Sequence, residues 1–180
     1  MLEPSDSFEC KEYTKLAFSL SEQFDTPVFI RLSTRVSHSQ SLVELCDREE
    51  APLKDYKKDV PKNVMMPAMA IKRHVVVEER TKALTEYSEK TPLNTVEMNG
   101  SEVGVITAGI SYQYAKEALG DSVSYLKLGC VNPLPIELIK NFAANCDKVY
   151  VLEELDPFIE EHCKQIGIDV IGKDAFTLQG

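Results

Sequence analysis

Two kinds of hydrophobic pattern follow each other at the start of the chain, and each predicts a different element. Apolar residues recur at helical spacing and predict an amphipathic helix over about residues 8–24; they are Tyr13, Leu16, Ala17, Leu20 and Phe24. Asp6 and Glu9 stand three residues apart at its beginning, which predicts a capping box. The apolar run 28–32 that follows is typical of a parallel strand covered on both faces.

One helix and one such strand cannot form a sheet with two covered faces. We therefore interpret residues 1–36 as the last αβ unit of a domain whose earlier part lies outside this chain. Such an isolated segment should be mobile or docked on another copy of the chain. We predict an extended linker over residues 37–66. A short helical turn can begin near Ser37, but 47–62 is rich in charge and contains two prolines, which favours an extended chain.

From residue 67 onward the pattern becomes regular. A helix is predicted over about 67–87, and five strands follow, with helices between the later ones, at 94–98, 103–107, 123–128, 149–152 and 168–171. Ser111 is expected to cap one helix, Pro135 to occupy the first position of the next, and Asp156 to cap the last. The strand–helix alternation predicts an α/β fold of three layers, α/β/α, with a mostly parallel sheet.

Composition and charge exclude several classes of function. The 180 residues include 29 acidic and 20 basic ones, for a net charge of -9. This balance argues against binding to nucleic acid or to anionic lipid. No apolar run approaches the roughly 20 residues of a membrane helix, and the first residues lack the features of a signal peptide. We therefore expect a cytoplasmic protein.

Metal-binding and nucleophilic patterns are weak. The five cysteines are scattered without a C-x-x-C pair, so they predict no zinc or iron–sulfur ligand set. Cys130 follows a strand, but no histidine lies near it in sequence, which favours a structural thiol. Glu153, Glu154 and Asp156 could hold Mg²⁺, yet Asp156 is expected to cap a helix and the two glutamates to point apart. We predict no metal site, and we place His74 and His162 on solvated helix faces.

Candidate binding residues lie where strands end, because open parallel sheets bind ligands at that edge. The loop 107–111, with Gly109 and Ser111, could present backbone N–H groups to an anion. It matches no nucleotide-binding motif, which favours a tight turn capped by Ser111. Arg35 and His38 follow the strand 28–32 and are a candidate binding or interface pair; the alternative is a loop that hydrogen-bonds itself through its serines. No catalytic triad or comparable motif is present.

Several stretches together resemble the alpha subunits of indolepyruvate ferredoxin oxidoreductases. They run in one order along nearly the whole chain, at residues 3–7, 25–28, 34–39, 73–80, 107–115 and 153–161. The resemblance implies an internal piece of a longer subunit. Residues 1–36 would be the tail of the pyrimidine-side thiamine diphosphate domain, 37–66 a linker, and 67–180 a domain like the C-terminal domain of transketolase. Cys10 and Cys130 depart from the family's pattern, which weakens any role for them.

For the parent enzyme, the resemblance implies oxidative decarboxylation of aryl pyruvates, indolepyruvate first, to aryl-acetyl-CoA. It implies thiamine diphosphate, Mg²⁺ and [4Fe–4S] clusters as cofactors. The implied partners are the remaining domains of the alpha subunit, a beta subunit, ferredoxin and coenzyme A. For the segment itself it implies a structural or assembly role without catalytic residues or bound cofactors. Arg35, His38, Gly109 and Ser111 are then only peripheral candidates for cofactor contact.

Two alternatives remain open at this point. A flavodoxin-like module would bind a phosphate-bearing ligand through the loop 107–111 and would have a complete sheet without residues 1–36. A small interaction protein would have no enzymatic parent. The Asn99-Gly100 pair also predicts that 94–98 and 103–107 are antiparallel neighbours, whereas the family pattern places the antiparallel first strand beside the third, and we follow the family.

Overall fold

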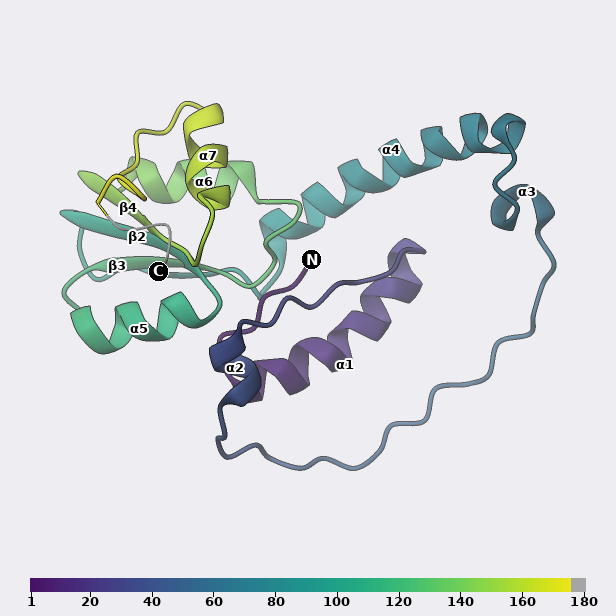
Figure 1. The fold of residues 1–180 in the computed structure, drawn as a ribbon, viewed down its shortest axis with the longest axis horizontal. Coiled ribbons are helices and arrows are strands. Elements are labelled where there is room, and N and C mark those ends of the chain that lie inside the picture. The colour runs from purple at the N-terminus through teal and green to yellow at the C-terminus, as the bar shows by residue number, and fades with distance from the viewer. Residues whose placement is uncertain (176–180) are drawn as a thin grey trace.

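The computed structural model describes residues 1–175. A sheet with helices on both faces lies at one end of the molecule, and a long helix projects away from it (Figure 1). The elements, in chain order, are α1 (Ser7–Phe24), α2 (Thr34–His38), α3 (Val60–Asn63), α4 (Pro67–Lys90), β1 (Thr95–Glu97), β2 (Val103–Ala108), α5 (Ile110–Leu119), β3 (Ser124–Leu128), α6 (Ile136–Ala144), β4 (Lys148–Leu152) and α7 (Phe158–Gln165).

The sheet confirms the predicted three layers. Its strand order is β1-β3-β2-β4, with β2 parallel to both β3 and β4. Ile106 and Leu126 on one face pack with residues of α6 and α7, whereas Val105 and Tyr125 on the other face pack with α5. The central strands are buried on both sides, which explains their nearly continuous apolar sequences. Among residues 1–175, none of the helices combines the length and apolar character needed to cross a membrane.

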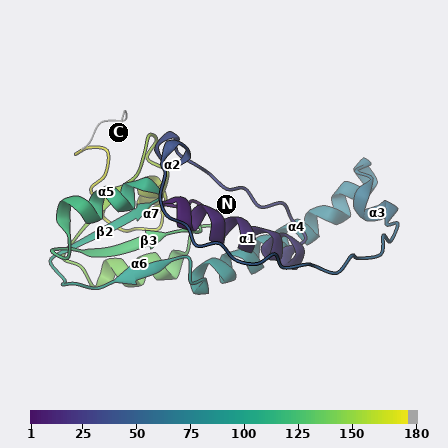
Figure 2. The same cartoon turned by 90° about the horizontal axis from the view of Figure 1, so that it is seen from below.

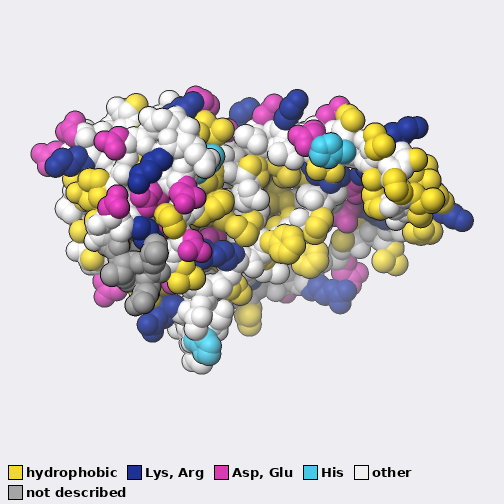
Figure 3. Space-filling view, turned by 45° about the horizontal axis from the view of Figure 1, so that its top comes forward, with side chains coloured by type: hydrophobic (Ala, Val, Ile, Leu, Met, Phe, Trp, Pro, Cys, Tyr) yellow, Lys and Arg dark blue, Asp and Glu magenta, His cyan; other side chains and the backbone are white. Residues whose placement is uncertain are grey.

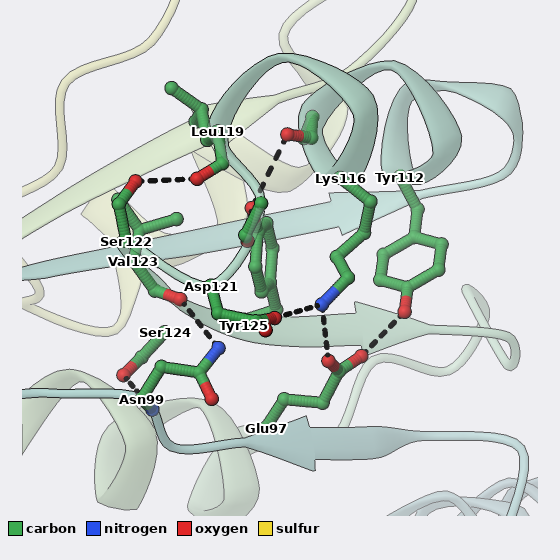
Figure 4. A network of polar contacts seen from close by, with 12 residues as sticks. Glu97, Asn99, Tyr112, Lys116, Leu119, Asp121, Ser122, Val123, Ser124 and Tyr125 are labelled. Atoms are coloured by element: carbon green, nitrogen blue, oxygen red, sulfur yellow. Dashed lines mark hydrogen bonds and ion pairs between the residues drawn. The ribbon is translucent and has the colours of Figure 1, made fainter.

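The antiparallel strand β1 pairs with β3, as the family pattern predicts, and not with β2. The backbone N–H groups of Asn99 and Gly100 donate to Ser124 Oγ at 3.0 and 3.2 Å, and the Asn99 amide donates to the Val123 carbonyl at 2.9 Å (Figure 4). These bonds hold the chain after β1 against the beginning of β3. The hairpin suggested by the Asn99-Gly100 pair is therefore wrong.

Two predicted strands are reduced to single bridges. In the run 28–32, only Ile30 pairs, with Leu2, while Phe29 is 71% and Leu32 47% exposed. The sheet-covered strand predicted there is wrong, because among residues 1–175 no further strand lies beside it to bury the apolar side chains. At the end of the chain, Ile171 bridges to Tyr150, and the predicted strand 168–171 does not form.

Three helices begin differently from the predictions. Gly109, not Ser111, is the N-cap of α5, while Pro135 and Pro157 are the N-caps of α6 and α7. Carboxylates from other elements bind the free N–H groups of the last two. Glu89 of α4 accepts from the first turn of α6 at 2.8 and 2.9 Å, and Glu153 accepts from the first turn of α7 at 2.8 and 3.0 Å. Glu153 thus takes the role predicted for Asp156.

Residues 1–36 pack within the same chain. Leu2, Tyr13 and Leu20 form a buried cluster with Cys130 at the edge of the sheet. The expectation of a mobile segment, or one docked on another copy, is therefore wrong. Asp6 caps α1 by accepting from the Glu9 N–H at 2.8 Å, but the Glu9 carboxylate accepts from the N–H and hydroxyl of Ser5 instead of completing the predicted capping box.

The extended conformation predicted for the linker is confirmed over residues 39–59, with the short helices α2 and α3 at its two ends. Its contacts with α1 are ionic and exposed: Lys15 pairs with Glu49 at 2.5 Å, and Lys54 pairs with Glu22. The linker therefore runs beside α1 (Figure 2) without joining a hydrophobic core.

Candidate functional site at the carboxyl edge of the sheet

The N-terminal residues of the chain cover the edge where the parallel strands end. Leu2 exchanges backbone hydrogen bonds with Phe29 and Arg31 at 2.8 Å each, and the Glu3 N–H donates to the Gly129 carbonyl at 2.9 Å. Open parallel sheets bind their ligands outside this edge. In this protein, a segment of the same chain lies across it.

Glu3 stands against the turn at the beginning of α5, beside the loop where the sequence suggested an anionic ligand. A Cβ atom built on Gly109, whose φ is +53°, would lie only 2.6 Å from Glu3 Oε1, so the carboxylate stands directly against this turn. Arg31 Nη1 donates to Glu3 Oε1 at 2.6 Å, and the Glu3 side chain is only 9% exposed. A phosphate at the loop 107–111 would meet this carboxylate. The sheet is complete without residues 1–36, as the flavodoxin-like alternative requires, but Glu3 argues against that alternative.

Burial sets the protonation behaviour of Glu3. Loss of hydration raises the pKa of its carboxyl; the hydrogen bond and charge of Arg31 oppose this effect, and the nearby negative charge of Glu154 adds to it. The net result is a raised pKa. Glu3 is thus a carboxylate held in place by one arginine, and it fixes the N-terminal strand segment against Gly109.

A cleft of about 280 Å³ lies beside the Glu3–Arg31 pair. Glu153 and Glu154 line it together with the apolar side chains of Leu155 and Phe158. Glu153 is committed to the first turn of α7, and burial raises the pKa of its carboxyl. Within residues 1–175, no group of three or more His, Cys, Asp or Glu side chains is arranged to hold a metal ion.

The predicted site residues lie near α5 but do not form a constellation. Gly109 and Ser111 begin α5, and Arg35 Nε donates to the Tyr114 hydroxyl of the same helix at 3.1 Å. Arg35 and His38 are both exposed on α2. The hydrogen bond from Arg35 to Tyr114 is therefore a surface contact between α2 and α5. Their positions suit an interface or a peripheral contact rather than a water-excluded reaction site.

A buried polar cluster that the sequence pattern does not predict lies beneath the beginning of α1. Lys127, the next-to-last residue of β3, is only 7% exposed; its ammonium group pairs with Glu9 and lies 4.7 Å from the centre of the Tyr112 ring. Burial alone would raise the pKa of Glu9, but hydrogen bonds from Lys127 and Ser5 outweigh it and hold the pKa below its ordinary value. A lysine inside an apolar strand signals a buried partner, although the sequence did not identify which one.

A second polar network joins β1 to α5. Glu97 accepts from the Tyr112 hydroxyl at 2.5 Å and from Lys116 Nζ at 2.9 Å (Figure 4). Burial, followed by the hydrogen bond to Glu97, raises the pKa of Tyr112 to about 12. Tyr112 therefore stays protonated at neutral pH and acts as a donor that secures the edge strand.

The buried thiols and the half-buried histidine show no sign of activation. Cys130 is 5% exposed, and burial raises the pKa of its thiol; burial also raises the pKa of Cys163, to about 12. Protonated thiols of this kind are poor nucleophiles, in agreement with the structural role predicted for Cys130. His162 was expected on a solvated face, but it is half-buried, its Nε2 has no partner among the described residues, and burial lowers its pKa.

The sequence was compared with protein families and with individual known proteins. No protein-family model matches the chain. The sequence is similar to the indolepyruvate oxidoreductase subunit IorA of Archaeoglobus fulgidus (37% identity over 96% of this chain), of Thermococcus kodakarensis (37% over 97%) and of Methanothermobacter thermautotrophicus (36% over 99%). The chain spans only 29–31% of the length of these relatives.

A solved structure shares the fold. It is a 2-oxoglutarate:ferredoxin oxidoreductase from Magnetococcus marinus with 2-oxoglutarate, coenzyme A and succinyl-CoA bound, and it aligns with a TM-score of 0.64 at 17% sequence identity. The alignment covers 99% of this chain and 39% of that one. The resemblance inferred from the sequence motifs is thereby confirmed: along nearly all of its length, this chain is a relative of a segment of the indolepyruvate oxidoreductase subunit IorA.

Proposed function

We propose that this chain is a supporting segment of the alpha subunit of a thiamine diphosphate-dependent 2-oxoacid:ferredoxin oxidoreductase. The names of the relatives support indolepyruvate as a substrate of the whole enzyme. We propose that this enzyme decarboxylates indolepyruvate and other aryl pyruvates oxidatively to aryl-acetyl-CoA. Within that enzyme, the segment holds neighbouring parts in place and carries no catalytic residue. Its partners are the remaining domains of the alpha subunit and a beta subunit, with ferredoxin and coenzyme A as reactants of the whole, cytoplasmic enzyme.

One observation carries the supporting role: the edge of the sheet at which ligands bind is occupied by the chain's own Glu3 and Arg31. A buried carboxylate whose partner is a neighbouring arginine stands against the turn where an anionic substrate would otherwise bind. The apolar and polar contacts of residues 1–36 then serve to fix α1 against the sheet.

The described residues do not fit the cofactors of the whole enzyme. A [4Fe–4S] cluster takes four closely spaced thiolates, but Cys130 and Cys163 belong to separate buried clusters and Cys46 lies on the exposed linker. No carboxylate group among residues 1–175 is arranged as a metal site. We propose that thiamine diphosphate, Mg²⁺ and the iron–sulfur clusters are bound by residues outside this chain.

The proposed domain boundaries follow the same reasoning. All four strands of the sheet come from residues 95–152, which supports a transketolase C-terminal-like domain from residue 67 to a last part that lies outside the described residues. Residues 1–36 are proposed to be the tail of the preceding domain, and 37–66 the linker. Arg35 and His38 are proposed as peripheral contacts on the side of α5.

The test is to produce the whole subunit that contains this segment, together with its partner subunit, and to measure dye reduction that depends on indolepyruvate and coenzyme A. The double variant R35A/H38A should keep kcat within about threefold, because neither residue acts on the reacting atoms. K127M should lower the yield of assembled enzyme while leaving the activity of each assembled complex unchanged. A loss of about 100-fold or more in kcat for assembled R35A/H38A, the size expected for a general acid or base, would reject the supporting role.

A further inference from the structure

The corner formed by α3 and the first half of α4 leaves its large apolar side chains exposed, while Lys62 and Arg73 pair with Asp25 at the end of α1 at 2.6 and 3.9 Å. This α3–α4 corner, residues 60–76, projects at the end of the molecule opposite the sheet (Figure 1, Figure 2). Ile71 is 74% and Met66 58% exposed, and further large apolar side chains are exposed around them: Val60, Val64, Met65, Val75 and Val76. In contrast, the second half of α4 packs through Tyr87 against Phe24 and through Glu89 against α6.

Basic side chains outnumber acidic ones around this apolar surface, although Asp59 also lines the hollow between α3 and α4. Residues 54–73 contain six basic and two acidic side chains, whereas residues 91–175 contain six basic and thirteen acidic ones. Lys57, Lys58 and Lys72 take part in no ion pair within residues 1–175. The space-filling view shows the same arrangement at this end, a hydrophobic patch edged by basic side chains (Figure 3).

The corner also has a shape that can receive side chains. A hollow of about 460 Å³ opens between α3 and α4, with Met69 and Val76 on its apolar wall and Lys72 and Arg73 at its edge. Methionine side chains adapt to differently shaped partners, and the corner contains three of them, Met65, Met66 and Met69. Contiguous apolar patches with a polar rim mark interaction sites on soluble proteins.

We propose that the α3–α4 corner is the docking surface for a different protein surface that is apolar at its centre and carries Asp and Glu side chains at its rim. The inference rests on the proposed function and deepens it, because it names how the supporting segment is held in the larger enzyme. A second copy of the chain fits less well, since a symmetric contact would place Lys72 and Arg73 beside their own equivalents. An anionic lipid surface would repel the acidic remainder of the chain.

The test uses the full chain and two fluorescent helical peptides with the same leucine face. One peptide carries glutamate on both sides of that face, and the other carries lysine. Fluorescence anisotropy should show that the glutamate peptide binds at least about tenfold more tightly than the lysine peptide, and that its affinity falls with added salt. The charge reversals K72E/R73E should cost about tenfold or more in affinity. The matched reversals K140E/K148E on the sheet domain should leave it unchanged.

The apolar centre is tested separately with I71S/V75S, which should also weaken binding while circular dichroism shows an unaltered fold. Equal binding of both peptides, no binding of either, or full binding by K72E/R73E contradicts the proposal. Tighter binding to phosphatidylserine vesicles than to the glutamate peptide would instead assign the surface to membranes. Dimer formation in sedimentation runs that K72E/R73E abolishes would assign it to a second copy. None of these measurements depends on enzyme activity, so they fail independently of the assembled-enzyme assay.

Discussion

Replacement of Lys127 by methionine tests how α1 is fixed to the sheet. Lys127, the next-to-last residue of β3, is 7% exposed, and it pairs with Glu9, whose side chain is 18% exposed. Methionine has nearly the same length but no charge. The variant K127M therefore removes the partner of Glu9 while it leaves the carboxylate in its buried position.

The size of the effect follows from what Glu9 keeps. Removal of one member of a buried ion pair costs about 3–5 kcal/mol, because the other charge is left uncompensated. Glu9 retains two hydrogen bonds from Ser5, each of 2.8 Å, and part of its carboxylate reaches solvent. We therefore expect a loss near the lower end, about 3 kcal/mol. The double variant E9Q/K127M should recover part of it, with a coupling energy of about 1 kcal/mol or more.

The assay is urea unfolding of the full chain at pH 7, followed by circular dichroism, for the wild type, both single variants and the double variant. K140M is the matched control, because Lys140 on α6 is 44% exposed and its ion pair with Glu137 lies on the surface. It should change the free energy of unfolding by no more than about 0.5 kcal/mol. If K127M costs less than about 1 kcal/mol, or if the two single effects simply add, the buried pair does not anchor α1 in the way described.

The remaining predictions concern pH, backbone geometry, helix capping and the linker. The pKa of Glu9 lies below its ordinary value of 4.5, so its contribution to stability is present above that pH and is lost as the pH falls through the folded-state pKa. The wild type should therefore lose stability in acid more steeply than E9Q. Equal slopes of stability against pH for the two proteins would count against this. G109A should lower the free energy of unfolding in urea by about 1–3 kcal/mol, because φ of Gly109 is +53° and the new Cβ would meet Glu3. The control G100A has open space at its Cβ and should be nearly neutral. Similar losses for both variants would refute the close approach of Glu3 to Gly109. E89Q should lower the free energy of unfolding by about 1 kcal/mol, because it weakens the hydrogen bonds from the first turn of α6. The control E86Q, on the exposed side of α4, should leave it unchanged. A larger loss for E86Q than for E89Q would exclude the capping role of Glu89. Trypsin should cut first after Lys54, Lys57 or Lys58 in the exposed linker; a first cut inside α4 would show that the linker is protected.

The sheet could be predicted from sequence because its strands are short, apolar and regularly separated by helices. Val103–Ala108 and Ser124–Leu128 are covered on both faces, and apart from Lys127 their apolar positions indicate buried strands without reference to a distant partner. The position of β1 beside β3 was predicted only through family resemblance, since the local turn signal at Asn99-Gly100 suggested the opposite. The ladder between β1 and β3 forms that pairing, and Ser124, 24 residues after Gly100, supports it by accepting the Gly100 N–H through its hydroxyl.

Elements that depend on distant residues were predicted incorrectly. The run 28–32 has the composition of a central strand, but it meets only Leu2 and stays largely exposed. The helix N-termini at Pro135 and Pro157 use carboxylates from other elements, Glu89 and Glu153, which no local capping motif reveals. The same limit applies to the candidate site: the sequence indicated the turn at Gly109, but not that Glu3, more than a hundred residues earlier, would stand against it.

We propose that this chain supports an enzyme whose cofactors are bound by residues outside it. Isothermal titration of thiamine diphosphate with Mg²⁺ into the full chain, and in parallel into the whole subunit assembled with its partner subunit, tests it most directly. We expect saturable heat for the assembled enzyme and none for the chain alone at the same concentrations. Micromolar binding of thiamine diphosphate to the chain alone would contradict it.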